Sequence, residues 1–475
     1  MNRLYRTETD SIGEKEIPAE AYYGIQTLRA KENFPITGYN LDDSMITAVA
    51  MVKKAAAMAN RDAGHLPLHI SEAIIGAADE LLEGFHHDQF LVDPIQGGAG
   101  TSVNMNANEV IANRALEIAG RDKGDYDYIN PNNHVNMAQS TNDVFPTTMH
   151  IAAVTGMTRL EQTMETMADT FGKKAADFDH IIKVGRTHLQ DAVPIRLGQE
   201  LKSYQRVIER DLNRIRRSKD NLFEINMGAT AVGTGLNADP VYTKLVVEYL
   251  ADISGLPLRA AENLVDTTQN TDAYTEVSSA LKNTMTSMSK IANDFRLMAS
   301  GPRTGLSEIT LPARQPGSSI MPGKVNPVMP EVINQIAFQV MGNDHTVSMA
   351  SEAGQLELNV MEPVMIFNLL ESITIMNNGF GVFTDLCLKD LQANEEVLRE
   401  NVEKSLGIIT ALSPHIGYER SSQIAQEGIR TGKTVRTLCM EYEVLNYEDL
   451  EIILDSYEMT YPGIAGAHLK EEMTV

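Results

Sequence analysis

Three stretches of the chain carry apolar residues at every third or fourth position, and two further apolar runs occupy residues 329–341 and 360–376. The three stretches cover residues 151–171, 197–215 and 277–298. A step of three or four matches the 3.6-residue turn of an α-helix, so each stretch predicts a helix with one apolar face. The first stripe alone extends over about 30 Å at 1.5 Å per residue. Several helices of this length, joined by short loops, favour a helical bundle.

The apolar pattern changes along the chain and divides it into three predicted domains. Residues 1–140 mix short segments with turn signals, whereas residues 141–395 hold the long stripes. Residues 396–475 return to shorter helical segments, with turns predicted at 413–415 and 461–463. A chain of 475 residues is also longer than a usual single domain. We therefore predict a mainly α, three-domain chain with an N-terminal domain, a central long-helix bundle and a small C-terminal helical domain.

Composition argues against several classes of protein. The net charge of −24 disfavours broad nucleic-acid or anionic-membrane surfaces, which need basic patches. No stretch approaches the roughly 20 apolar residues of a membrane span, and residues 1–30 lack the apolar core of a signal peptide. Cys387 and Cys439 lack metal-ligand spacing, and the adjacent His86 and His87 predict a polar turn. We expect a cytoplasmic protein that has no metal site and binds neither nucleic acid nor membrane.

Polar clusters interrupt the apolar pattern at three places in the first half of the chain. Residues 96–102 form a Gly-rich turn before a predicted helix, whose free N–H groups attract anions. Residues 140–143, Ser-Thr-Asn-Asp, are a helix-capping run that can also donate to a ligand. Residues 183–191 include His188 near a predicted helix start, where Asp191 or another acid could fix the imidazole tautomer. Plain capping and a structural histidine are the alternatives.

A fourth cluster, residues 317–327, reads Gly-Ser-Ser-Ile-Met-Pro-Gly-Lys-Val-Asn-Pro. Pro322 and Pro327 interrupt any helix, so the stretch predicts a loop with free backbone N–H groups beside Lys324. Such a loop suits binding a carboxylate and stabilising an anion that develops during a reaction. A flexible Gly-Ser linker is the alternative.

The fourth cluster resembles the signature loop Gly-Ser-Ser-x-Met-Pro-x-Lys-x-Asn of the aspartase/fumarase superfamily, whose members eliminate across a bond beside a carboxylate. The three earlier clusters resemble the other substrate-binding regions of that family, and residues 22–36 resemble the opening of its aspartase members. The likeness extends from about residue 20 to about residue 400. The runs at 226–231, 327–331 and 357–363 favour the aspartase branch over the fumarase branch.

The resemblance implies which residues form the active site. Ser318 would be the general base that removes the Cβ proton of L-aspartate. The residues implied to bind the substrate are Thr101, Ser140, Thr141, Asn142, Thr187, His188, Ser319, Lys324 and Asn326.

The resemblance also implies an assembly and a reaction. The assembly would be a homotetramer with a multi-helix core, in which three subunits contribute to each active site. The reaction would be the reversible conversion of L-aspartate into fumarate and ammonia through an enediolate, without a cofactor. Two alternatives stay open: a fumarate hydratase, and a non-catalytic structural member of the superfamily.

Overall fold

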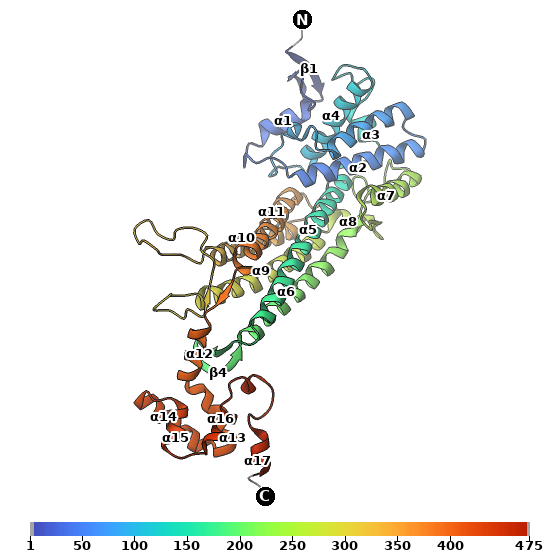
Figure 1. The fold of residues 1–475 in the computed structure, drawn as a ribbon. Helices are drawn as coiled ribbons and strands as arrows, with labels where there is room; N and C mark the ends of the chain where they lie inside the picture. The colour runs from blue at the N-terminus through green and yellow to red at the C-terminus, as the bar shows by residue number, and fades with distance from the viewer. Residues whose placement is uncertain (1–3, 473–475) are drawn as a thin grey trace. The chain divides into compact units, whose positions relative to one another are not determined.

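The computed structural model describes residues 4–472, and these residues are mainly helical (Figure 1). Their contacts group into two compact units. The first unit comprises Met1–Gln162, Asp211–Met285 and Ile336–Asn377, and the second comprises Thr163–Arg210, Thr286–Gln335 and Asn378–Val475. The predicted domain boundaries at residues 140 and 395 stay a prediction.

The predicted stripes lie in long helices, and each of these helices contributes residues to both units. The long helices are α5 (Thr141–Asp177), α6 (Leu197–Lys219), α9 (Asp272–Met298), α10 (Val328–Glu352) and α11 (Glu362–Phe383). Every apolar residue that defines the first three stripes is buried. In the second unit, Phe171, Tyr204, Phe295 and Phe383 bring α5, α6, α9 and α11 together with ring centroids 5.6–6.4 Å apart. The predicted mainly α fold with long packed helices is confirmed.

The remainder of the first unit comprises β1 (Tyr5–Asp10), β2 (Gly13–Pro18), α1 (Ile25–Asn33), α2 (Asp43–Asp62), α3 (Leu68–Leu82), α4 (Thr101–Ile118), β5 (Glu224–Ile225), α7 (Pro240–Ser254), β6 (Arg259–Ala260) and α8 (Leu264–Gln269). Within it, α3, α4 and α7 pack against α2, and α1 packs against α4 and the β1–β2 hairpin. Strands β1 and β2 form an antiparallel hairpin in which Tyr5 lies opposite Pro18. Buried alanines such as Ala48, Ala55 and Ala59 let α3 and α7 approach α2 closely.

The second unit ends in short helices around their own apolar core. Its further elements are β3 (Ile182–Thr187), β4 (Gln190–Arg196), β7 (Ile309–Thr310), β8 (Gln392–Ala393), α12 (Glu395–Lys404), α13 (Ile409–Ile416), α14 (Tyr418–Thr431), α15 (Val435–Glu441), α16 (Tyr447–Ile453) and α17 (Ala467–Glu472). The turn predicted at 413–415 is wrong, because Pro414 lies inside α13. This helix ends two residues later, and Leu412, which is fully buried, holds the segment against the core.

None of the helices between residues 4 and 472 combines the length and the hydropathy of a membrane span.

Candidate active site

The first two polar clusters meet at the N-termini of α4 and α5. Thr101 is the first residue of α4, and Gly100 caps that helix with a φ of 86°. Asn104, one turn into α4, donates from Nδ2 to Thr141 Oγ1 at 3.1 Å. Two helix starts therefore lie together in the first unit, an arrangement suited to a carboxylate. Thr101 is exposed and Ser140 and Asn142 are partly exposed, whereas Thr141 is only 9% exposed.

Gly100 is required for this approach of the two helices. A Cβ at this position would lie 2.3 Å from Phe145 Cγ, and the positive φ disfavours any other residue. We expect Gly100→Ala to lower the free energy of unfolding by about 2 kcal/mol, because the aromatic ring or the helix start must move. Thermal unfolding measures this loss. Gly120→Ala is the control, because it has a similar φ of 72° and nothing within 4 Å of the added carbon. Equal losses in both variants would show that the φ angle alone matters.

Ser140 and Asp143 confirm the predicted helix-capping run. Ser140 Oγ accepts from the N–H of Asn142 at 3.2 Å, and Asp143 Oδ1 accepts from the N–H of Ser140 at 3.0 Å. Asp143 is fully buried, and its other oxygen accepts from the N–H groups of Gly228 and Thr230 at 3.2 and 3.1 Å. The carboxylate thus ties the start of α5 to the Gly-rich loop before α7.

Sequence reasoning missed Lys53, whose fully buried ammonium group lies behind this helix start. It donates to Asn104 Oδ1 at 2.7 Å, Gln139 Oε1 at 2.9 Å and Asn136 Oδ1 at 3.0 Å. Burial lowers the pKa of Lys53 to about 7 and raises the pKa of Asp143 to about 7, while the attraction between their charges opposes both shifts. A lysine within the alanine-rich run of α2 was the available signal.

The fourth cluster is a loop, as predicted, and its own hydrogen bonds close it. The N–H of Gly317 donates to the carbonyl of Lys324 at 2.7 Å, and Asn326 Nδ2 donates to the carbonyl of Gly317 at 2.9 Å. Gly323 turns the chain with a φ of 82°. These bonds hold Ser318, Lys324 and Asn326 on one short closed segment, so the stretch differs from a flexible linker.

Ser318 occupies a special place in this loop. Its Oγ accepts from the backbone N–H groups of Ile320 at 3.2 Å and Met321 at 3.0 Å. Two N–H groups that donate to one hydroxyl oxygen stabilise its deprotonated form, the alkoxide. Ser319 and Lys324 are exposed in the single chain, so both are open to a ligand or to another surface.

The third cluster forms a β-hairpin, and the predicted helix start at His188 is wrong. Thr187 ends β3 and Gln190 begins β4, while His188 and Leu189 form the turn with φ values of 55° and 60°. Two successive positive φ values match the tight turn that joins twisted antiparallel strands. Among the described residues no hydrogen bond joins Asp191 to the imidazole, and Asp191 Oδ1 lies 4.0 Å from Arg186 Nε. Thr187 and His188 are both exposed at the tip.

The structure therefore collects the sequence-predicted residues into three groups. Thr101, Ser140, Thr141 and Asn142 lie together in the first unit. In the described part of the second unit, no hydrogen bond or ion pair links the hairpin tip to the loop at 317–327.

No group of three or more His, Cys, Asp or Glu side chains across residues 4–472 could hold a metal ion. His86 caps a 3₁₀ turn, η1 (His87–Gln89).

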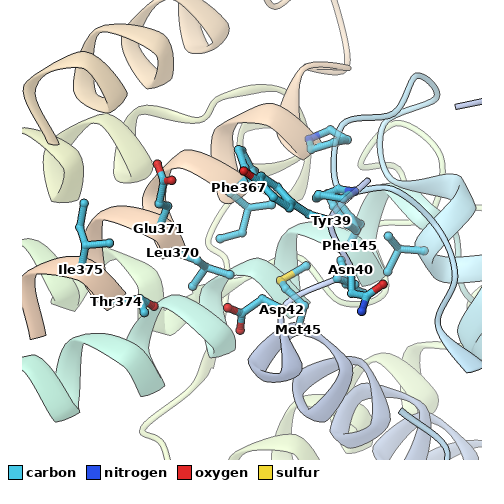
Figure 2. Close-up of a pocket in the computed structure, with 15 residues that line it drawn as sticks. Tyr39, Asn40, Asp42, Met45, Phe145, Phe367, Leu370, Glu371, Thr374 and Ile375 are labelled. Atoms are coloured by element: carbon cyan, nitrogen blue, oxygen red, sulfur yellow. The ribbon is translucent and has the colours of Figure 1, made fainter. Parts of the chain in front are cut away.

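An apolar pocket in the first unit suits a dicarboxylate poorly. Figure 2 shows this pocket, of about 280 Å³, between the segment around Tyr39 and α11. Phe145 and Phe367 line it, and none of the predicted site residues does. A ligand with two charged carboxylates would lose more solvation there than this lining could replace.

The chain is similar to known proteins over most of its length. A lyase family model matches residues 13–342, and a model of the fumarase C C-terminus matches residues 408–461. An aspartate ammonia-lyase of Bacillus subtilis is 67% identical over 468 residues, covering 98% of each chain.

Two solved structures are also similar. A fumarate lyase:delta crystallin of Brucella melitensis, bound to cobalt, is 46% identical with a TM-score of 0.94, covering 96% of this chain and 100% of that chain. A class II fumarase of Schistosoma mansoni is 35% identical with a TM-score of 0.92, covering 96% of this chain and 99% of that chain. This chain belongs to the aspartase/fumarase superfamily of lyases.

Proposed function

We propose that this chain is a carbon–nitrogen lyase that converts L-aspartate reversibly into fumarate and ammonia. The Bacillus subtilis relative, an aspartate ammonia-lyase at 67% identity, supports this substrate. The observation that carries the proposal is the Ser318 hydroxyl, which two backbone N–H groups of a closed loop stabilise as an acceptor.

Ser318 is the general base in this proposal. The Cβ proton of aspartate is weakly acidic, and its removal places charge on the adjacent carboxylate as an enediolate. A serine oxygen acts as a base only if its anion is stabilised, and the N–H groups of Ile320 and Met321 supply that stabilisation. Lys324 adds a positive charge on the same loop. Once the carbanion has formed, the amine leaves from Cα.

The remaining residues hold the two carboxylates of the substrate. The N-termini of α4 and α5 present Thr101 and the 140–142 run with their N–H groups, which favours an anion. Thr187, His188 and Ser319 add donors, and Lys324 and Asn326 complete the set from the loop. Donors that contact the enediolate more strongly than the ground-state carboxylate increase the rate of proton removal.

We propose a homotetramer in which different subunits supply the three groups. The helix starts belong to one contact unit, whereas the hairpin tip and the loop belong to the other. Phe338 and Met349, three turns apart on α10, are 65% and 59% exposed in the single chain, as expected for a face that another subunit covers. Light scattering would give a tetramer mass. At L-aspartate concentrations far below the KM of Thr141→Val, where neither variant alone is active, mixing refolded Ser318→Ala and Thr141→Val subunits would restore turnover, because some mixed sites contain neither change. Mixtures without recovery would contradict shared sites.

The experiment that tests the reaction follows the ultraviolet absorbance of the fumarate double bond together with ammonia release. L-aspartate and L-malate are supplied separately to the purified protein. We expect both signals with aspartate alone. A rise with malate alone would identify a fumarate hydratase, and no rise with either substrate would favour a structural member of the superfamily.

A further inference from the structure

Asn104 lies directly behind the proposed carboxylate site and contacts one of its hydroxyls. Asn104 is 2% exposed, so a substrate is affected by it only through its neighbours. Nδ2 donates to Thr141 Oγ1 at 3.1 Å and to Asn136 Oδ1 at 3.2 Å, and Oδ1 accepts from Lys53 Nζ at 2.7 Å. Every polar atom of the Asn104 amide therefore has a partner.

The contact with Lys53 fixes which way the Asn104 amide points. An ammonium group has three donors and no acceptor, so the atom 2.7 Å from Lys53 Nζ must be the amide oxygen. The NH₂ group then necessarily faces Thr141 Oγ1. The amide cannot flip without placing two donors against each other in a buried site, which is costly.

The orientation of the amide in turn determines what the Thr141 hydroxyl can do. A hydroxyl has one O–H donor and two acceptor lone pairs. Because Oγ1 accepts from Asn104, the hydroxyl hydrogen cannot point at that NH₂ group and must point elsewhere. Thr141 is the first residue of α5, at the helix end that favours anions, so a bound carboxylate is a natural acceptor.

We propose that Asn104 is a positioning residue that fixes the Thr141 hydroxyl as a hydrogen-bond donor to a substrate carboxylate. This inference rests on the proposed lyase function. Lys53 fixes the orientation of the Asn104 amide, and the amide fixes the direction of the Thr141 O–H, which donates to the substrate carboxylate. The chain of contacts gives the buried lysine a role beyond packing.

The substitution that tests this role is Asn104→Asp. It preserves shape and gives Lys53 a partner of opposite charge, but its carboxylate only accepts hydrogen bonds. The Thr141 hydroxyl then donates to the new carboxylate and no longer to the substrate. We expect the KM for L-aspartate to rise about 10- to 100-fold, the value of one hydrogen bond to a charged group, with kcat changed less than about threefold.

Asn108→Asp is the matched control on the same helix. Asn108 is also fully buried, and it also donates to Asn136 Oδ1 at 3.2 Å, but it does not contact Thr141. The control therefore loses the same bond to Asn136 and gains the same charge one turn away. We expect its KM to stay near that of the unchanged protein. An equal rise in both variants would overturn the proposal, because charge near the site would then suffice.

A double-mutant cycle with Thr141→Val decides whether Asn104 acts through that hydroxyl. We expect Thr141→Val to raise KM at least as much as Asn104→Asp, and we expect Asn104→Asp to add nothing in its background. The inference would be overturned if the double variant had a KM about 10- to 100-fold above that of Thr141→Val. An unchanged KM in Thr141→Val alone would also overturn it, and that measurement does not require the Asn104 variant to fold. If the unchanged protein fails to turn over aspartate, the proposed function fails; normal turnover with unchanged KM in these variants refutes only the inference.

Discussion

Ser318→Ala is expected to lower kcat for L-aspartate by at least about 10³-fold, because it removes the base that takes the Cβ proton. The N–H groups of Ile320 and Met321 would then face a methyl group, and no other hydroxyl on the loop has the same two donors. The KM should change little, since the remaining donors still bind both carboxylates. Steady-state kinetics of fumarate formation, together with fumarate protection against thermal unfolding, separates loss of chemistry from loss of binding.

Ser405→Ala provides the matched control for stability. Its Oγ accepts from the N–H of Gly407, two residues on, at 3.1 Å, just as Ser318 Oγ accepts from Ile320. Ser405 is buried, so its truncation should cost at least as much stability as that of the half-exposed Ser318. We expect Ser405→Ala to keep its activity. A near-normal rate in Ser318→Ala would refute the base assignment.

The long helices could be predicted because each stripe is a local property of the sequence. Residues such as Met157, Leu281 and Ile291 repeat at the helical period, and any packing partner on that face buries them. The Ser140 cap was predictable for the same reason, since the capping bonds reach only two or three residues along the chain.

The sequence could not show the contacts that join distant segments. Asp143 looks like an ordinary capping acid, yet its second oxygen binds the N–H groups of Gly228 and Thr230. From the sequence, Lys53 resembles a surface lysine, but in the fold its ammonium group is buried against the amides of Asn104 and Gln139. These bonds depend on loop paths, which no period in the sequence encodes.

The helix start predicted at His188 was wrong for a different reason. Its neighbours suggested a helix start, but two positive φ values made a hairpin turn without glycine or asparagine at either position. Sequence signals for tight turns depend on those residues. We infer that long-range contacts of β3 hold the turn instead, and we expect the hairpin to depend on them.

Glu308 makes such long-range contacts with β3, and its side chain is fully buried in the second unit. Its Oε2 lies 2.8 Å from Lys183 Nζ, and its Oε1 pairs with Arg186, so one carboxylate holds two cations of β3. Lys183 is itself buried, with Glu200 at 2.8 Å as its second partner. Arg186 immediately precedes Thr187, which places this ion cluster directly behind the hairpin tip that carries two proposed substrate-binding residues.

We expect Glu308→Ala to lower the free energy of unfolding by about 3–5 kcal/mol, because it leaves two cations, Lys183 and Arg186, with Glu200 as the remaining close carboxylate. Unfolding at fixed protein concentration measures the loss, since assembly would otherwise shift the midpoint. The control is Asp390→Ala, which removes the exposed partner 2.7 Å from Arg314 and should cost no more than about 1 kcal/mol. Faster proteolysis at the hairpin tip in Glu308→Ala should accompany the loss. Equal stability of the two variants would mean that the buried cluster does not anchor β3, and the positions of Thr187 and His188 would then need another explanation.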